Sequence, residues 1–155
     1  MNFRIHALPY QDFAPLFDLR PDELAGRRAR IVVAEESPGY PCRVSLADAR
    51  VGERVLLINH EHLPANSPYR SCHAVFVREH ARQASPAPGT VPDAIARRLI
   101  SARAFDGQDF MVTAEVCEGT LLDELIAEMF ADDRVAYLHL HHARRGCYAA
   151  RVTRT

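Results

Sequence analysis

Hydrophobic and polar residues alternate over much of the chain, and this pattern predicts a protein built mainly from strands. A period of two over four to eight residues is typical of a strand with one buried face, and β-branched runs favour the same conformation. The segments of this kind are residues 3–8, 31–35, 42–46, 54–60, 71–79, 100–105, 110–116, 135–142 and 147–154. Because some of these segments are short, we expect seven to eight strands.

Two of these strand pairs are separated by short loops and predict hairpins. In the first, Asp106–Gly107 supplies the residues that a type I′ turn requires. Its second strand alternates apolar with polar positions, which predicts one buried face made by Phe110, Val112, Ala114 and Val116. In the second hairpin, a four-residue loop at 143–146 would place His142 opposite Cys147.

A period of 3.6 residues predicts fewer and shorter helices. The clearest helix spans residues 120–133, with Thr120 as its N-cap. Its apolar stripe consists of Leu122, Leu125, Ile126, Met129 and Phe130. Thr90 and Asp93 resemble a capping box that begins a helix reaching Arg97, and short helical pieces are expected at 13–17 and 21–24.

These elements predict an α+β fold in a single domain over residues 1–155. Hairpins and tight turns dominate, and regular alternation of strands with helices is missing. We expect a strongly curled antiparallel or mixed sheet, partly closed as a barrel, of about seven to eight strands with three to four short helices.

Composition narrows the function classes. A net charge of −1 argues against a nucleic-acid binder, and no apolar run approaches the length of a membrane span. The N-terminus lacks a secretory signal, so we expect a cytoplasmic protein. All 19 basic residues are arginine. Without lysine the chain can form neither a Schiff base nor a P-loop, and the sequence leaves any cofactor unknown.

Histidines occur two apart at two places, which raises the question of a metal site. His60 with His62, and His139 with His141, would each share one face of a strand. Two such pairs could build a tetrahedral site. Polar residues on a solvated strand face give the same spacing more often, so the sequence assigns no metal ligands.

Four cysteines stand at positions 42, 72, 117 and 147, with no C-x-x-C pair. Cys42 and Cys147 lie beside turns and are candidate nucleophiles, with His62 or His141 as the acid–base group. The alternative is that both thiols are buried and inert. No G-x-S-x-G segment is present, which removes the hydrolases built on that motif.

Arginine stands close to tyrosine at three separate turns. The three pairs are Tyr40 with Arg43, Tyr69 with Arg70, and Tyr148 with Arg151. Arginine binds carboxylates and phosphates through a planar pair of donors, so three converging turns would form an anion site. The alternative is that these side chains tie loops to the edges of the sheet.

Three segments carry a resemblance to a known family: GYPCRVSLADARVGERVLL, EHLPANSPYRSCHAVFVRE and VAYLHLHHARRGCYAARV. Over essentially the whole chain, the sequence resembles a bacterial family known only as domain of unknown function 1203. The resemblance implies no activity, substrate or cofactor. It implies that nine residues belong to the family's pattern: Tyr40, Cys42, Arg43, His62, Tyr69, Arg70, Cys147, Tyr148 and Arg151.

The sequence therefore favours a cytoplasmic pocket protein for a small anionic metabolite that carries carboxylate or phosphate, with cysteine and histidine chemistry available. Two alternatives stay open. One is a non-catalytic interaction or structural module, and the other is a histidine-rich metal-binding protein. The only partner expected is the small anion, without nucleic acid or membrane; enzymatic activity and oligomeric state are left open.

Overall fold

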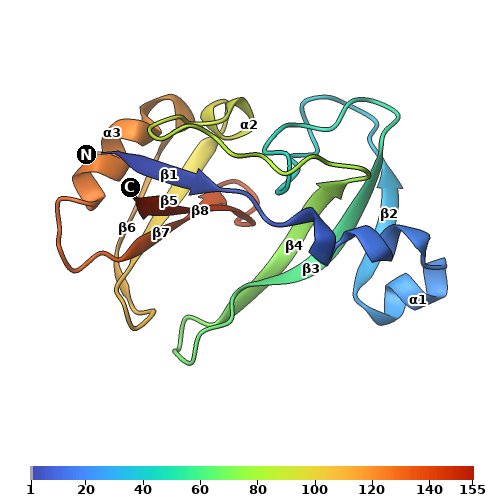
Figure 1. Ribbon diagram of the computed structural model, residues 1–155, viewed down its shortest axis with the longest axis horizontal. Helices are drawn as coiled ribbons and strands as arrows, with labels where there is room; N and C mark the ends of the chain where they lie inside the picture. Colours follow the sequence, from blue (N-terminus) through green and yellow to red (C-terminus); the bar gives the residue numbers. More distant parts are fainter. Residues whose placement is uncertain (1) are drawn as a thin grey trace.

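The computed structural model describes residues 2–155, which form eight strands in two antiparallel sheets. The strands are β1 (Phe3–His6), β2 (Ala29–Val33), β3 (Arg54–Leu63), β4 (Ser71–Arg78), β5 (Leu99–Phe105), β6 (Met111–Glu118), β7 (Tyr137–His142) and β8 (Tyr148–Arg154). The five-stranded sheet has the order β1-β8-β7-β5-β6, and the three-stranded sheet has the order β2-β3-β4. The two sheets lie side by side in Figure 1. The α+β class and the number of strands are confirmed.

The predicted strongly curled sheet, partly closed as a barrel, is wrong. Neither sheet closes on itself, because β1 and β6 remain the edges of one sheet and β2 and β4 the edges of the other. The alternation of hydrophobic and polar residues indicates only that each strand has one buried face. The same alternation arises when the strands divide between two open sheets.

Three α-helices and three short 3-10 helices accompany the sheets. They are η1 (Tyr10–Asp12), η2 (Ala14–Asp18), α1 (Pro21–Gly26), α2 (Asp93–Ala96), η3 (Gly119–Leu121) and α3 (Leu122–Met129). Helix α3 lies beside the five-stranded sheet, whereas α1 lies at the far side of the three-stranded sheet (Figure 1). None of the helices in residues 2–155 has the length and apolar character that crossing a bilayer requires.

Several local predictions are corrected. The segment 42–46 is not a strand; Cys42 forms only an isolated bridge with Phe76, and Leu46 has a φ of 51°. Helix α2 begins after Pro92 and α3 after Leu121, so neither Thr90 nor Thr120 is the N-cap. The two helix errors share a cause, since capping residues two or three positions away from a helix start are compatible with several starting points.

The loop between β5 and β6 is wider than a type I′ turn. The carboxylate of Asp106 accepts the backbone N–H groups of Gln108 and Phe110, at 2.8 and 3.0 Å. The left-handed residue is Asp109, whose φ is 64°. The predicted buried face of β6 is also wrong, because Phe110 is 46% and Val116 55% exposed. Strand β6 is an edge strand, and little of the chain covers it.

The two faces of the five-stranded sheet have different partners. On one face, Leu138 and Leu140 of β7 pack with α3 in the larger apolar core. The alternate residues, His139 and His141, lie on the other face and contact His62 of β3 in the three-stranded sheet. The space between the sheets therefore contains aromatic and polar side chains.

Two β-bulges position residues on this shared face. In β3 the register shifts between Glu61 and Leu63, so His62 is the extra residue. In the β7–β8 pair the register shifts after Leu140, which pairs Tyr148 with His141. A bulge of one residue moves the following side chain to the opposite face of the sheet. Tyr148 consequently joins the histidines between the sheets.

We predict that Gly119→Ala destabilises the fold by about 2 kcal/mol, a typical cost of overpacking. A Cβ at this position would lie 2.3 Å from the carbonyl oxygen of Ile95 and 2.6 Å from that of Ala96. Backbone cannot move aside as a flexible side chain can. Urea denaturation would measure the loss of unfolding free energy, with Gly107→Ala as the control because a Cβ there meets nothing within 4 Å. Equal stability of the two variants would contradict the prediction.

Candidate functional site

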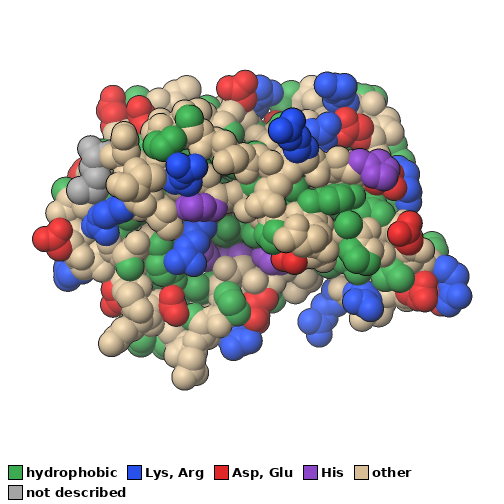
Figure 2. Space-filling view, viewed as in Figure 1, with side chains coloured by type: hydrophobic (Ala, Val, Ile, Leu, Met, Phe, Trp, Pro, Cys, Tyr) green, Lys and Arg blue, Asp and Glu red, His purple; other side chains and the backbone are tan. Residues whose placement is uncertain are grey.

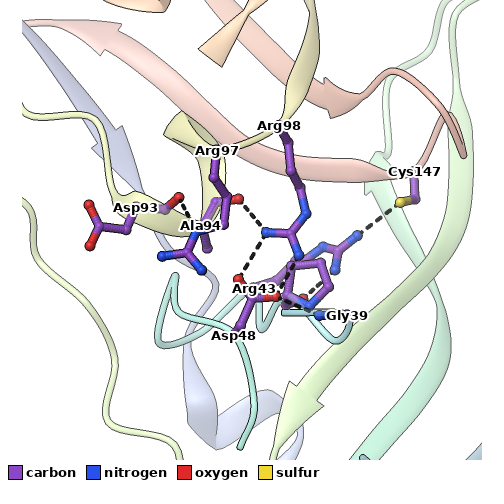
Figure 3. Close-up of polar contacts among 9 residues, drawn as sticks. Gly39, Arg43, Asp48, Asp93, Ala94, Arg97, Arg98 and Cys147 are labelled. Carbon is purple, nitrogen blue, oxygen red and sulfur yellow. Dashed lines mark hydrogen bonds and ion pairs between the residues drawn. The ribbon is translucent and has the colours of Figure 1, made fainter. Parts of the chain in front are cut away.

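A cavity of about 680 Å³ lies where the β7–β8 hairpin, strand β4, the start of β5 and the 36–43 loop meet. Five arginines line it: Arg43, Arg97, Arg98, Arg144 and Arg145. The other charged side chains of the lining are Glu36 and Glu118, so arginines outnumber carboxylates. Figure 3 shows the polar contacts at this site.

Arg43 is the most buried of these arginines, with only 2% of its surface exposed. Its Nε donates to the carbonyl oxygen of Tyr148 at 2.7 Å, and its Nη1 donates to the carbonyl oxygen of Pro41. Its Nη2 donates to the sulfur of Cys147 at 3.0 Å (Figure 3). The guanidinium thus ties the 39–43 loop to the start of β8.

The charge of Arg43 has no carboxylate partner among residues 2–155. Burial lowers the pKa of Arg43, and the neighbouring Cys147 acts in the opposite direction. A buried, unpaired guanidinium is costly, because it loses hydration without gaining a counter-charge. The cavity beside it is the place where a counter-charge could be bound.

Arg98 has its carboxylate in place. Its Nη2 and Nη1 donate to the two carboxylate oxygens of Asp48, at 2.5 and 3.0 Å. Its Nη1 also donates to the carbonyl oxygen of Ala94 at 2.5 Å. Asp48 also accepts the N–H of Gly39 at 3.3 Å (Figure 3). This bidentate pair fixes the loop against α2, so we assign Arg98 to the wall of the cavity.

Arg97, Arg144 and Arg145 are exposed at the mouth of the cavity and form no ion pair with residues 2–155. Arg97 donates only to the carbonyl oxygen of Asp93, at 3.1 Å. Their guanidinium groups are therefore available for an incoming anion.

Two histidines of the lining carry unsatisfied polar atoms. The buried Nδ1 atoms of His73 and His142 have no hydrogen-bond partner among residues 2–155. Burial, followed by the charges of Arg43 and Arg98, lowers the pKa of His142 to about 3. His142 is neutral at pH 7 and can donate or accept a hydrogen bond inside the cavity.

The two candidate nucleophiles have different surroundings. The Cys42 sulfur accepts the backbone N–H groups of Ser45 and Arg78, both at 3.3 Å, and does not line the cavity. Cys147 lines the cavity beside Arg43. The four-residue loop is confirmed, because the N–H of His142 donates to the carbonyl oxygen of Cys147 at 2.9 Å. Cys42 therefore has the contacts of a structural thiol.

The three arginine turns do not meet around one cavity. Of Arg43, Arg70 and Arg151, only Arg43 lines it. Arg70 forms an exposed bidentate pair with Glu61, at 2.9 and 3.1 Å. Arg151 lies 4.0 Å above the ring of Tyr137, on the face between the sheets.

The three tyrosines are likewise dispersed. Tyr40 packs against Phe76, with ring centroids 5.1 Å apart. Tyr69 contacts the rings of Phe105 and Phe110 near the loop that joins β5 to β6. Tyr148 lies among the histidines and stacks on His62 at 5.0 Å, and burial raises its pKa. None of these three side chains lines the cavity.

The histidines predicted to lie on a solvated strand face are buried instead. His139 and His141 are each 2% exposed, and His62 is half-buried against them. The three rings each offer a nitrogen, and these nitrogens lie within 4.8 Å of one another. The correction arises because the second sheet covers the face on which they lie. His60 stays outside this cluster and packs against Phe13.

Sequence reasoning missed most of the cavity lining. Arg97–Arg98 and Arg144–Arg145 are the two adjacent arginine pairs at the cavity, and each stands at the end of a short element. Doubled arginines beside a turn could have indicated the site. His73 and His142 carried no comparable signal, because one lies inside an ordinary strand and the other follows two further histidines.

Residues 39–154 match the family described as "Protein of unknown function (DUF1203)". No curated protein and no solved structure matches the chain. The matched segment covers most of the chain and includes the five cavity arginines, Cys147 and the three clustered histidines. The predicted resemblance is thereby confirmed, and the chain belongs to the DUF1203 family, whose function is uncharacterised.

Proposed function

We propose that the chain binds a small anionic ligand, bearing phosphate or carboxylate groups, in the arginine-lined cavity. The observation that carries the proposal is Arg43, a guanidinium that is buried at the cavity wall without a carboxylate partner among residues 2–155. A bound anion would supply the missing counter-charge. Arg144 and Arg145 at the mouth would add direct contacts.

The size of the cavity supports a small molecule. Its volume of about 680 Å³ lies within the range of roughly 300–1,000 Å³ that is usual for metabolite and cofactor sites. The lining also includes apolar side chains, Leu57, Phe76 and Leu99 among them, which would contact the uncharged part of the ligand. A ligand with an anionic group on a compact organic body fits this lining better than a bare inorganic ion.

Chemistry on such a ligand would involve Cys147 and His142. Both line the cavity on either side of the hairpin loop, and the Cys147 sulfur accepts a hydrogen bond from Arg43. A thiol beside an arginine and a neutral histidine has the neighbours that nucleophilic catalysis uses. Of the acid–base candidates that the sequence suggested, His62 and His141 lie in the histidine cluster instead.

Inorganic phosphate and citrate, titrated calorimetrically into the purified chain, would test the proposal. We expect one equivalent of at least one of these anions to bind, with an affinity that falls as salt is added. In the double variant Arg144→Gln/Arg145→Gln we expect the affinity to drop about tenfold or more, because charge-assisted hydrogen bonds contribute roughly 1.5–3 kcal/mol each.

The matched control is Arg27→Gln/Arg30→Gln. It removes two exposed arginines that lie outside the cavity and changes the net charge by the same amount. Equal losses in the two double variants would show that only overall charge matters and would contradict a specific site. Absence of binding of both anions to the unaltered chain would contradict the proposal directly.

A further inference from the structure

The second group of reactive side chains lies between the sheets and is separate from the cavity lining. It consists of His62 from β3 with His139 and His141 from β7. Histidine side chains are visible in the recess between the two halves of the molecule on the face shown in Figure 2. The proposed anion site uses none of these three residues.

The separation of His62 and His139 suits a shared metal ion. Their Nδ1 atoms are 3.4 Å apart. Two nitrogens that bind one tetrahedral zinc ion, each at about 2.0–2.1 Å, lie about 3.3 Å from each other. In the metal-free chain this short contact needs a proton on one of the two nitrogens, and a metal ion would take the place of that proton.

His141 is oriented by a backbone contact of the kind that supports metal-binding histidines. Its Nδ1 lies 2.9 Å from the carbonyl oxygen of Gly146. A carbonyl oxygen only accepts, so Nδ1 carries the proton and the lone pair of the neutral ring lies on Nε2. Ligating histidines generally donate their second ring nitrogen to such a partner, which fixes the tautomer and the ring.

The surroundings hold the three rings in place and keep them neutral. Tyr148 stacks on His62 and contacts the other two rings edge-on, at centroid distances of 5.1 and 6.0 Å. Burial is the main cause that lowers the pKa of His62 to about 4 and that of His139 to about 3. Neutral imidazole is the form that binds transition metals.

We propose that His62, His139 and His141 form a three-histidine site for a divalent first-row transition metal, with zinc as the ion that the geometry fits best. The site would join the three-stranded sheet to the five-stranded sheet, because β3 contributes one ligand and β7 contributes two. Three protein ligands leave a fourth position open, as in zinc sites that bind water or substrate. No carboxylate belongs to the cluster, which disfavours magnesium and calcium.

Arg103 indicates what the fourth ligand would be. It lies on β5 beside β7, pairs with His139 across the strands, and donates to Ser101 at 3.3 Å. A fixed positive charge near the ion favours an anionic fourth ligand, such as hydroxide or a small carboxylate.

Titration of untagged, chelator-treated protein with Zn²⁺ alone tests the site. We expect one equivalent to bind and the melting temperature to rise, since the ion would bind the folded chain and link its two sheets. Substitution with Co²⁺ should give the visible absorption of a tetrahedral complex, which an exposed, water-rich site would not show.

Variants locate the bound ion. His62→Gln and His139→Gln should each lower Zn²⁺ affinity by more than about 100-fold, since loss of a ligand exceeds the 10–100-fold cost of losing its supporting contact. His62 is half-buried, so His62→Gln carries the test if His139→Gln fails to fold by circular dichroism. The control His80→Asn removes an exposed histidine, and asparagine tolerates the φ of 58° at that position.

The proposal is overturned if the unaltered chain binds no Zn²⁺, or if binding survives unchanged in both His62→Gln and His139→Gln. It is supported if these variants lose the ion while His80→Asn retains it. Arg144→Gln/Arg145→Gln should also retain Zn²⁺, which separates a failure of this inference from a failure of the proposed anion site.

Discussion

Lowering the pH from 7 to 5 is expected to destabilise the metal-free chain by about 7 kcal/mol, judged from the linkage between protonation and folding. The cause is four histidines whose pKa is lowered mainly by burial, to about 4 for His62 and to about 3 for His139, His141 and His142. Typical domains have total stabilities of only about 5–15 kcal/mol. We therefore expect substantial unfolding near pH 5.

The stability falls with pH because the unfolded state binds more protons than the folded state. In the unfolded chain each histidine has a pKa near 6.5. In the folded chain His62 stays neutral until about pH 4 and the other three until about pH 3. Between these values the unfolded state binds more protons. The stabilising contribution is therefore fully present above about pH 6.5 and is lost progressively as the pH falls toward the folded value.

Urea denaturation at intervals between pH 7.5 and 5, with EDTA present to exclude metal binding, would measure this dependence. Near pH 5 the slope should correspond to about four protons, at about 1.4 kcal/mol per pH unit for each proton. The variant His142→Gln should reduce the slope by about one quarter, whereas His80→Asn, at an exposed position, should leave it unchanged. A stability that stays flat between pH 7 and 5 would contradict the prediction.

Replacing Arg43 with methionine should cost about 3 kcal/mol of unfolding free energy, because buried carbonyls left without donors cost roughly 1–3 kcal/mol each. The two carbonyl oxygens are those of Pro41 and Tyr148, and the Cys147 sulfur loses its donor as well. Relief of the burial of the guanidinium offsets part of this cost. Binding of the anion should be lost in any variant that still folds.

Two further variants test whether the charge of Arg43 or its planar set of donors stabilises the fold. One is at Arg43 itself, and the other is a control at an exposed arginine. Arg43→Lys keeps the charge but not the planar set of donors, so we expect an intermediate stability and weakened anion binding. Arg70→Met removes an exposed arginine from its pair with Glu61 and should cost less than about 1 kcal/mol. Chemical denaturation and phosphate titration would measure both effects. If Arg43→Met were as stable as Arg70→Met, the structural role of Arg43 would be wrong.

Local patterns predicted the hairpins well because their signals are short-range. The terminal hairpin was expected at 135–142 and 147–154, and β7 and β8 lie at Tyr137–His142 and Tyr148–Arg154. Alternation of the strands and the glycine of the loop, which has a φ of 77°, are both properties of adjacent residues. The prediction that His142 lies opposite Cys147 followed from that register alone.

The partners of the strands could not be predicted in the same way. Which face of β7 meets a second sheet depends on β3, and the chain separates the two strands by more than seventy residues. The bulges at His62 and Ala149 added to the difficulty. A single inserted residue changes which side chains share a face of the sheet. The alternation of hydrophobic and polar residues does not reveal where such a residue is inserted.

The candidate site was only partly predictable for the same reason. Arg43 and Cys147 were identified because each stands beside a turn, and the structure joins them through a hydrogen bond of 3.0 Å. Arg70 and Arg151 have the same local signature but lie elsewhere. Side chains beside turns are easy to recognise, whereas the convergence of turns is a property of the tertiary fold.

The pairing of β1 with β8 has a consequence for how the molecule is made. Phe3 lies opposite Arg154, so β1 pairs with β8, which is synthesised after the seven other strands described here. The whole three-stranded sheet, residues 29–78, is synthesised between them. A chain still growing on the ribosome therefore carries β1 without its partner strand until β8 has been made, and the five-stranded sheet gains this edge only then.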